Sequence, residues 1–348
     1  MKIDKDSLKS SLKALLISLG ESEENAETVS GYMMMCDARG VTTHGSYMVN
    51  PVCDRREAGM MELPTQLDIV IDSGAVCVID GNDGLGQAAA DKACEIASAK
   101  AREYGISAVL LRNTNNVGAL GPYTEKIAAR GMIALMCCNA SPAMAPWGGR
   151  EQFTGTQPFA IGVYTGEEPV FSADMATAAV ARGKIRQAMR EGKTIPETWA
   201  LDAEGKPTTD PAEAIRGILL PIGGPKGSAM ALAIDIAAGM LSGSAYAPNV
   251  KAIHYPEGKA GVGGCIIAID IAHFMDLEEF RAKMQEYLSS IRNMQKAEGV
   301  TRIYIPGEIE YEKTLASYAE GISLSDTAVE QLNRKLEKYG IPALVPVE

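Results

Sequence analysis

A histidine in a short polar segment bounded by glycines is the clearest sign of chemistry in this sequence. The chain contains 3 histidines, and only His44 stands between two nearby glycines, Gly40 and Gly45, directly after the hydroxyl of Thr43. An imidazole ionises near neutral pH, so it can donate or accept the proton when a carbonyl and an alcohol interconvert. The segment predicts His44 as a catalytic acid or base with Thr43 beside it. A loop histidine held by backbone hydrogen bonds is the alternative.

A glycine-rich loop later in the chain could bind an anion. Gly223-Gly224-Pro225-Lys226-Gly227 precedes an apolar run at 228–242 that is typical of a helix. Backbone N–H groups at a helix start, together with the Lys226 ammonium, supply positive potential for a phosphate. The spacing is not that of a P-loop, and glycine-rich helix entries also occur without a ligand, so both interpretations stay open.

A motif near residue 84 matches the dinucleotide-binding fingerprint in its letters but not in its spacing from the preceding strand. A strand-like run at 76–80 is followed by Gly84-Leu85-Gly86-Gln87-Ala88-Ala89, which fits G-x-G-x-x-A at a helix start. The residues between the strand and the first glycine, 81–83, are too many for the tight turn that this fingerprint needs. A structural turn is therefore the favoured interpretation of the motif.

Metal and nucleophile chemistry find no support in the sequence. No group of His, Cys, Asp and Glu has the spacing of a metal site, and no G-x-S-x-G motif occurs. We therefore expect no catalytic metal.

The elements that must position these residues alternate between strand and helix. Two amphipathic helical patterns fill the first forty residues, ahead of His44. Alternation of strands and helices favours an α/β protein with a mixed or largely parallel sheet. Strand-like runs lie at 75–80, 108–111, 132–138, 160–163 and 265–271, and helical patterns at 87–103, 122–130, 173–200, 228–242 and 277–296.

Composition excludes several classes of protein. The 348 residues carry a net charge of -11, which argues against broad nucleic-acid binding. The short basic stretch 184–190 is expected on a solvated helix face. No run approaches the roughly 20 apolar residues of a membrane span, and the N-terminus does not resemble a signal peptide. The 7 cysteines form no C-x-x-C pair. Free thiols in a cytoplasmic protein are the expected outcome.

Taken in order, eight segments resemble the type-2 malate/L-lactate dehydrogenase family, which includes ureidoglycolate dehydrogenase, sulfolactate dehydrogenase, diketogulonate reductase and the cyclic-imine reductases. Eight segments in register along nearly the whole chain are a specific match. They are Asp37-Ala38-Arg39-Gly40 through His44-Gly45, Asp80-Gly81 through Gly84-Leu85-Gly86-Gln87, Asn113 through Gly118-Ala119, Asn139 through Pro146-Trp147-Gly148-Gly149, Gly155-Thr156-Gln157-Pro158, Asp174-Met175-Ala176-Thr177, Leu220-Pro221 through Lys226-Gly227, and Pro306-Gly307-Glu308.

The resemblance implies a fold and an assembly. The family has its own nicotinamide-binding fold rather than a Rossmann domain, built here on an α/β mixed sheet with helical segments at both ends of the chain. On this basis we expect residues 1–118 with 260–348 to form a substrate and oligomerisation domain, and 119–259 to form the NAD(P)-binding domain. A homodimer or larger homo-oligomer acting on a small-molecule substrate is implied, with no nucleic-acid or membrane partner.

The resemblance also implies roles for individual residues. His44 matches the family's site histidine, and Thr156 is expected to face the substrate near the nicotinamide. NAD or NADP is the implied cofactor. Its expected contacts are Ala140, Asp174, Met175, Ala176, Lys226, Pro306, Gly307 and Glu308.

The substrate positions depart from the family pattern while the cofactor positions keep it. Asn116 stands where members usually have a second histidine, Met48 replaces an arginine that grips the substrate carboxylate, and Val52 replaces a tyrosine. Asn cannot supply a titratable proton, and Met cannot make the two-bond pair that Arg makes with a carboxylate. We expect Asn116 to orient the substrate instead, in a pocket made more apolar by Met48 and Val52.

Three hypotheses follow. The first is an NAD(P)-dependent oxidoreductase whose substrate is not the usual small 2-oxo acid, or whose carboxylate is held by Arg39 or Arg55. The second is an ordinary 2-hydroxy-acid dehydrogenase that tolerates these replacements. The third is an inactive dinucleotide-binding homologue. The sequence favours the first, because drift to inactivity would also erode the cofactor loops.

Overall fold

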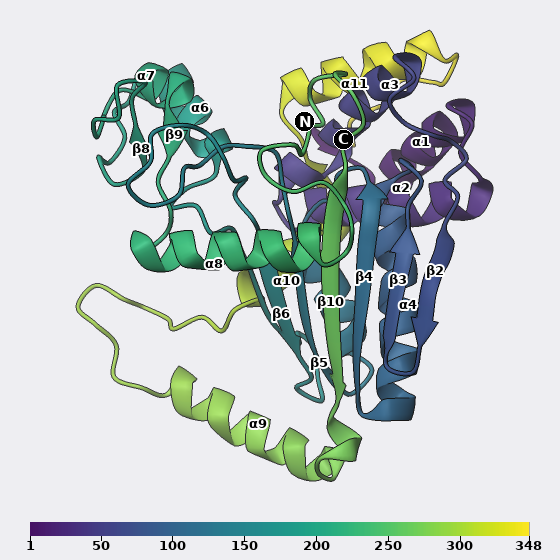
Figure 1. The fold of residues 1–348 in the computed structure, drawn as a ribbon, viewed down its shortest axis with the longest axis vertical. Helices are drawn as coiled ribbons and strands as arrows, with labels where there is room; N and C mark the ends of the chain where they lie inside the picture. Colours follow the sequence, from purple (N-terminus) through teal and green to yellow (C-terminus); the bar gives the residue numbers. More distant parts are fainter. Residues whose placement is uncertain (348) are drawn as a thin grey trace.

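A mixed seven-stranded sheet organises the molecule (Figure 1). The computed structural model describes residues 1–347. Along the sheet the strand order is β2-β3-β4-β10-β5-β6-β7, and within the described chain only β3 and β4 pair in parallel. The predicted mixed α/β fold is therefore confirmed. The strands are β2 (Asp68–Ser73), β3 (Val76–Asp80), β4 (Ile106–Thr114), β5 (Met132–Cys138), β6 (Phe159–Val163), β7 (Phe171–Met175) and β10 (Val262–Asp270).

One face of the sheet is covered by α4 (Gly86–Tyr104) and α5 (Gly121–Ala128). The inner side of α4 is a row of alanines, including the fully buried Ala89, Ala93 and Ala97. Small side chains let the helix lie close to the apolar, β-branched surface of the strands. Alternate residues of β5 and β10 complete this core, and the residues between them point to the opposite face of the sheet.

Gly84 and Gly86, the glycines of the G-x-G-x-x-A motif, allow close packing of neighbouring segments. A Cβ at Gly86 would lie 2.3 Å from the Asn115 carbonyl oxygen, and one at Gly84 would lie 2.6 Å from Thr65 Cγ2. Both positions need glycine because backbone and side chain approach them closely. The interpretation of this motif as a structural turn is supported.

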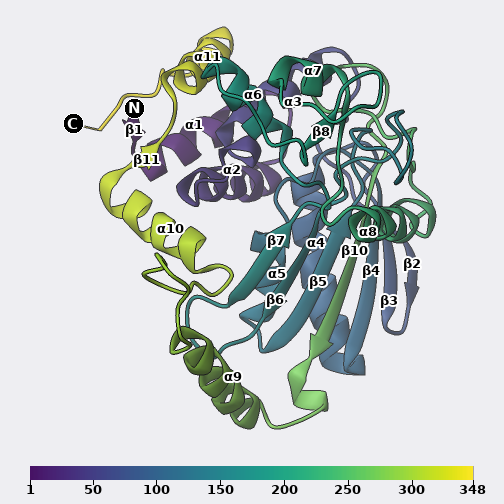
Figure 2. The same cartoon turned by 90° about the vertical axis from the view of Figure 1, so that its left-hand side faces the viewer.

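A helical layer built from both ends of the chain caps the sheet (Figures 1 and 2). Its helices are α1 (Lys5–Ser18), α2 (Glu23–Ala38), α3 (Val49–Glu57) and α11 (Asp326–Lys338). The hydroxyl of Ser22 accepts from the Asn25 N–H and begins α2 as an N-cap. β1 (Lys2–Ile3) pairs with β11 (Ile322–Ser323), so the two termini lie side by side.

A small lobe between β7 and α8 has its own hydrophobic core around Ile185 and Leu219. It contains α6 (Arg182–Arg190), β8 (Ala200–Leu201), α7 (Pro211–Arg216) and β9 (Ile218–Leu219). The predicted helix over 173–200 is wrong except for α6. Alanines in 173–181 mislead because their propensity is helical, whereas β7 pairs with β6 and the next residues bridge to the loop at Pro221.

The last elements complete the scaffold. α8 (Pro225–Asp235) begins three residues before the expected helix because Pro225 suits its first turn. It continues as the π-helical turn η3 (Ile236–Met240), and η4 (Ile271–His273) leads to α9 (Leu277–Arg292). A long connection then reaches α10 (Glu308–Glu320). Among the helices described, none has the length and apolar character needed to cross a membrane.

The sheet continues across the expected domain boundary. β10 belongs to the segment 260–348 and hydrogen-bonds to β4 on one side and to β5, from 119–259, on the other. The division into 1–118 with 260–348 and 119–259 stays a prediction, and these segments share one sheet rather than each having its own.

Candidate active site

The buried carboxylate of Asp37 holds the segment that carries His44. After α2 ends, η1 (Thr42–His44) and η2 (Ser46–Met48) form two short turns. The Ser46 N–H donates to Asp37 Oδ2 over 2.7 Å, and a Cβ at residue 45 would lie 1.9 Å from Asp37 Oδ1. Gly45 is thus required by close approach. Burial of Asp37 raises its pKa to about 6.

The surroundings of His44 keep its ring neutral. Its Nδ1 is buried and has no hydrogen-bond partner among residues 1–347. Burial, together with the nearby His254, lowers the pKa of His44 to about 4, so the ring is neutral at pH 7. The alternative from the sequence is a loop histidine held by backbone hydrogen bonds. Nδ1 makes no such bond to the described residues. Thr43, expected beside it, is exposed on the same turn.

Asn116 lies in the loop after β4. Its Oδ1 accepts from the Gly118 N–H over 2.9 Å, which fixes the side chain against its own loop. The neighbouring Asn115 is buried and accepts from Arg55. The substrate-orienting role of Asn116 stays a prediction, and only its amide nitrogen is left for it.

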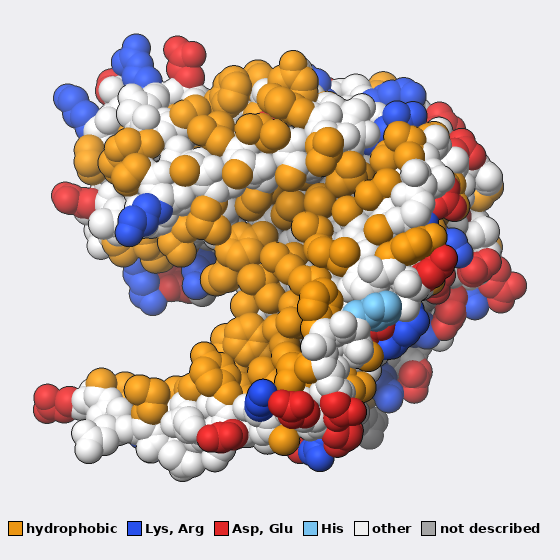
Figure 3. All heavy atoms as spheres, turned by 60° about the horizontal axis from the view of Figure 1, so that its bottom comes forward, with side chains coloured by type: hydrophobic (Ala, Val, Ile, Leu, Met, Phe, Trp, Pro, Cys, Tyr) orange, Lys and Arg blue, Asp and Glu red, His pale blue; other side chains and the backbone are white. Residues whose placement is uncertain are grey.

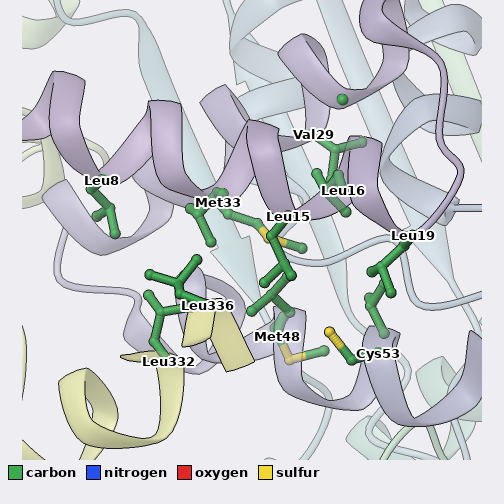
Figure 4. Packing of buried hydrophobic residues seen from close by; sticks show 14 of the residues in the cluster. Leu8, Leu15, Leu16, Leu19, Val29, Met33, Met48, Cys53, Leu332 and Leu336 are labelled. Atoms are coloured by element: carbon green, nitrogen blue, oxygen red, sulfur yellow. The ribbon is translucent and has the colours of Figure 1, made fainter. Parts of the chain in front are cut away.

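Met48 and Val52 belong to the core of the terminal helical layer. Their side chains are 2% and 1% exposed. Figure 4 shows Met48 among Leu15, Cys53 and Leu336 of the same hydrophobic cluster. In this conformation neither side chain has surface to offer a substrate, so the apolar residues at these positions extend the core.

The two arginines suggested as carboxylate ligands are committed elsewhere, and that part of the first hypothesis is wrong. Arg39 forms a two-bond ion pair with Glu125. Arg55 is fully buried, and its guanidinium donates to Asn115 Oδ1 and to the carbonyls of Tyr255 and Gly258 at 2.7 to 3.0 Å. Neither guanidinium therefore has a free pair of N–H donors for a two-bond contact with a ligand.

No role is expected for Arg182 from the sequence, yet its guanidinium Nε and Nη2 are buried without a hydrogen-bond partner among the described residues. Arg182 begins α6, and the space beside the next residue, Gly183, is bounded by Thr43: a Cβ built there would lie 3.5 Å from Thr43 Cγ2. One signal was available. The sequence between Met175 and Arg190 contains no Asp or Glu that could pair with Arg182 locally.

The residues expected to hold the cofactor lie along β7 and just after it. Asp174 Oδ2 accepts from the N–H groups of Leu120 and Gly121, over 2.9 and 2.8 Å, at the start of α5. Met175 is the last residue of the strand, and Ala176 follows it. The segment 306–308 lies near the start of the same strand, where the Ser172 N–H donates to the Pro306 carbonyl over 3.0 Å.

Glu308 is part of the framework of this edge. Its carboxylate is buried and accepts from the Ile305 N–H, from Arg292 and from Arg302. Burial opposes ionisation, but these donors outweigh it and lower the pKa of Glu308. Gly307 precedes it at φ 97°, a backbone conformation that glycine adopts freely.

A second chain of contacts leads from β7 to Lys226. The Thr177 N–H and hydroxyl both donate to the Thr156 carbonyl, over 2.9 and 2.8 Å, and the Ile222 N–H donates to the Thr177 carbonyl over 2.8 Å. Lys226 follows in the first turn of α8 and is exposed. The predicted anion-binding loop is thereby connected to the residues at 174–176.

Ala140 joins the same group through a glutamine. The Ala140 N–H donates to Gln157 Oε1 over 2.7 Å, and Gln157 Nε2 donates to Asp235 Oδ1 over 2.8 Å. Gln157 is fully buried between them.

These residues fit a dinucleotide. An exposed ammonium at a helix start suits a phosphate, and the expected contacts lie along β7, with 306–308 beside Ser172 near its start and Thr156 beside Thr177 just after its end. No three His, Cys, Asp or Glu side chains within residues 1–347 come together as a metal site.

Comparison with known proteins defines first a class, the dehydrogenases. L-sulfolactate dehydrogenase of Methanocaldococcus jannaschii is 39% identical over 94% of each chain. Its solved structure superposes with a TM-score of 0.93, covering 98% of both chains at 38% identity. Malate dehydrogenase of Pyrococcus horikoshii is 34% identical over 99% of this chain and 97% of its own.

The family follows from a match to the family described as malate/L-lactate dehydrogenase, which covers residues 3–333. The chain belongs to this family, as the resemblance of its segments implied, and it is an oxidoreductase. A nicotinamide cofactor is likewise confirmed: similar proteins are named ureidoglycolate dehydrogenase (NAD(+)), from Escherichia coli, and (2R)-3-sulfolactate dehydrogenase (NADP(+)), from Chromohalobacter salexigens.

Proposed function

We propose that the protein is an NAD(P)-dependent dehydrogenase of a small 2-hydroxy acid. The observation that carries the proposal is the neutral ring of His44, whose buried Nδ1 has no partner within residues 1–347 and can therefore act as a base. Relatives named for sulfolactate, malate and ureidoglycolate support the substrate class. The preferred hypothesis from the sequence, an unusual substrate, has less support, because Met48 extends a core that needs apolar residues.

His44 acts on the proton. In oxidation the neutral imidazole accepts the hydroxyl proton of the substrate, and in reduction the imidazolium returns it. We assign Nδ1 to this step because the described chain offers it no other partner. Thr43 borders the same space, and its hydroxyl can bridge the imidazole and the substrate oxygen.

A nicotinamide cofactor bound along β7 would supply the hydride acceptor. Lys226 would pair with phosphate, and the backbone at 306–308 and Ala140 would border the cofactor. Asp174 and Glu308 fix these segments through bonds inside the protein. Thr156 would face the substrate side, where its carbonyl is already held by Thr177.

A turnover screen tests this function. The purified protein is incubated with NAD⁺ or NADP⁺ and with sulfolactate, malate, lactate, ureidoglycolate or a neutral secondary alcohol, and absorbance of the reduced cofactor is followed. We expect turnover with at least one hydroxy acid. Turnover of neutral alcohols alone would restore the unusual-substrate hypothesis, and cofactor binding without turnover of any substrate would support an inactive homologue.

We further infer a homodimer from an exposed apolar surface. Leu135 on β5, Leu241 after η3 and Tyr287 on α9 are 37%, 68% and 59% exposed, and Figure 3 shows apolar side chains gathered in a hollow on one side of the molecule. Apolar patches of this kind mark protein interfaces. Light scattering should give twice the chain mass of 36.9 kDa, and Leu241→Lys should lower it.

The cysteines support a cytoplasmic location. All seven are free, and most are buried. Free thiols persist in reducing compartments, so we infer a cytoplasmic protein. Cell fractionation with antibody detection tests this.

A further inference from the structure

An anionic substrate needs a cation, and the usual position for it is apolar here. Met48 lies in the core, while Arg39 and Arg55 have their donors engaged inside the protein. A carboxylate in a largely buried site is stable only if paired and hydrogen-bonded. The proposed function therefore requires a cationic side chain that neither the sequence nor the resemblance assigns.

Unsatisfied donors point to one arginine. Within residues 1–347, the buried side-chain atoms that have no hydrogen-bond partner are Asp37 Oδ1, His44 Nδ1, and Nε and Nη2 of Arg182. All of them belong to the His44 segment or to the start of α6 beside it. Buried polar groups in proteins are normally paired, so an exception in a site calls for a ligand.

The surroundings of Arg182 are cationic and face His44. Burial lowers the pKa of Arg182, and so does the like charge of Arg186 one helical turn further along α6. Burial also lowers the pKa of His254, again with a contribution from Arg186, and His254 in turn acts on His44. The approach of Gly183 to Thr43, with 3.5 Å between a Cβ built at residue 183 and Thr43 Cγ2, and the 6.2 Å between the rings of Tyr47 and His254 place α6, the segment around His254 and the His44 turn around a common space.

Arg55 builds part of this arrangement. Its donors hold the carbonyls of Tyr255 and Gly258, over 2.9 and 2.7 Å, and so fix the loop that carries His254. The ring of His254 lies 6.2 Å from that of Tyr47, on the turn after His44. A guanidinium that the resemblance-based hypothesis would have given to the substrate instead supports the wall of the pocket.

We propose that Arg182 binds the carboxylate of the substrate and takes over the role left empty by Met48. The proposal rests on the proposed function, for which it names the specificity-determining residue. Nε and Nη2 of a guanidinium are adjacent donors with the spacing of two carboxylate oxygens, so they form a two-bond pair. The substrate is thus held with its carboxylate against α6 and its hydroxyl toward His44. Arg186 and His254 add positive potential on the same side.

The energetics separate this role from a structural one. A buried guanidinium without partners costs stability in the free protein, and a bound carboxylate offsets that cost. Replacing Arg182 by an apolar residue of similar length should therefore leave the melting temperature unchanged or higher. An arginine that held the fold together would show the opposite.

The test compares Arg182→Met and Arg182→Lys with Arg190→Met, which removes the same charge from the exposed end of the same helix. For the best hydroxy acid of the turnover screen, we expect Arg182→Met to raise KM roughly 30-fold or more, with a smaller change in kcat. Arg182→Lys should recover part of the loss, and Arg190→Met should match the wild type. KM for the corresponding 2-hydroxy amide, in which a neutral carboxamide replaces the carboxylate next to the hydroxyl-bearing carbon, should not change.

Direct binding keeps the result independent of turnover. Malonate, a dicarboxylate that cannot be oxidised at a hydroxyl, is titrated calorimetrically into the wild-type and Arg182→Met proteins in the presence of NADH. Weaker malonate binding to Arg182→Met at an unchanged melting temperature supports the proposal. Equal KM and equal malonate affinity would overturn it, and so would an equal loss in Arg190→Met. Absence of any turnover in the wild type counts against the proposed function, and the malonate titration still decides on Arg182.

Discussion

The two sides of the active site differ in how their polar groups are satisfied. On the proposed cofactor side, Asp174, Gln157 and Glu308 have their side chains bonded within the protein. On the proposed substrate side, His44 and Arg182 hold buried atoms that find no partner among residues 1–347. One side is complete before any ligand arrives, and the other is completed by the ligand.

This difference indicates which substitutions will lower stability and which will lower activity. A side chain bonded within the protein contributes to folding, so its loss costs stability first. A buried side chain without a partner adds little to the stability of the fold or lowers it, so its loss should reduce function without reducing stability. Three substitutions and one pH profile test whether the two sides differ in this way.

The largest effect is expected from His44→Ala. Loss of the proton acceptor should lower kcat about 10²–10⁴-fold, while the cofactor dissociation constant stays within a few-fold and the melting temperature does not fall. Steady-state kinetics, cofactor fluorescence titration and calorimetry measure the three quantities. Unchanged kcat would remove His44 from the catalytic role.

Glu308→Ala should act on the other side in the opposite way. It removes the acceptor for Arg292, Arg302 and the Ile305 N–H, which should lower the free energy of unfolding by about 2 kcal/mol. Glu312→Ala, which breaks only an exposed pair with Arg302, is the control and should cost about 0.5 kcal/mol or less. Urea denaturation measures both. Equal losses would contradict the framework role of Glu308.

Lys226→Ala should affect the cofactor alone. Removing one exposed phosphate contact is expected to raise the dissociation constant of NADH or NADPH about tenfold, since one charged hydrogen bond is worth about 1.5 kcal/mol. Lys251→Ala, on another exposed loop, serves as the control. An unaltered constant would remove Lys226 from the cofactor site.

The smallest effect concerns pH. Because the pKa of His44 is about 4, the base is neutral from pH 5.5 upward, and kcat/KM for oxidation should not change through its ionisation between pH 5.5 and 8. Activity falls only as the pH drops through about 4, where His44 becomes protonated. A break near pH 6 would instead report Asp37, whose pKa is about 6, and Asp37→Asn would abolish that break.

The sequence predicted the fold class and the terminal helices, because each depends on local periodicity or on motifs that keep their order, while the role of Lys226 stays a prediction. It failed at 173–200, where alanines favour helix and pairing with β6 prevails. It also missed Arg182. Whether an arginine is paired depends on which distant carboxylates reach it, and that is decided by packing: Arg39 finds Glu125, while Arg182 finds none among the described residues.

The paired ends of the chain have a consequence for biosynthesis. Leu8, Leu15 and Met33 share one core with Leu332 and Leu336 (Figure 4), and the strand at Lys2–Ile3 pairs with Ile322–Ser323. During synthesis α1 and α2 therefore keep an apolar face uncovered until α11 has also been made. Such exposed surface is prone to aggregation during synthesis, so chaperones that recognise apolar helices should bind α1 and α2 until α11 covers them.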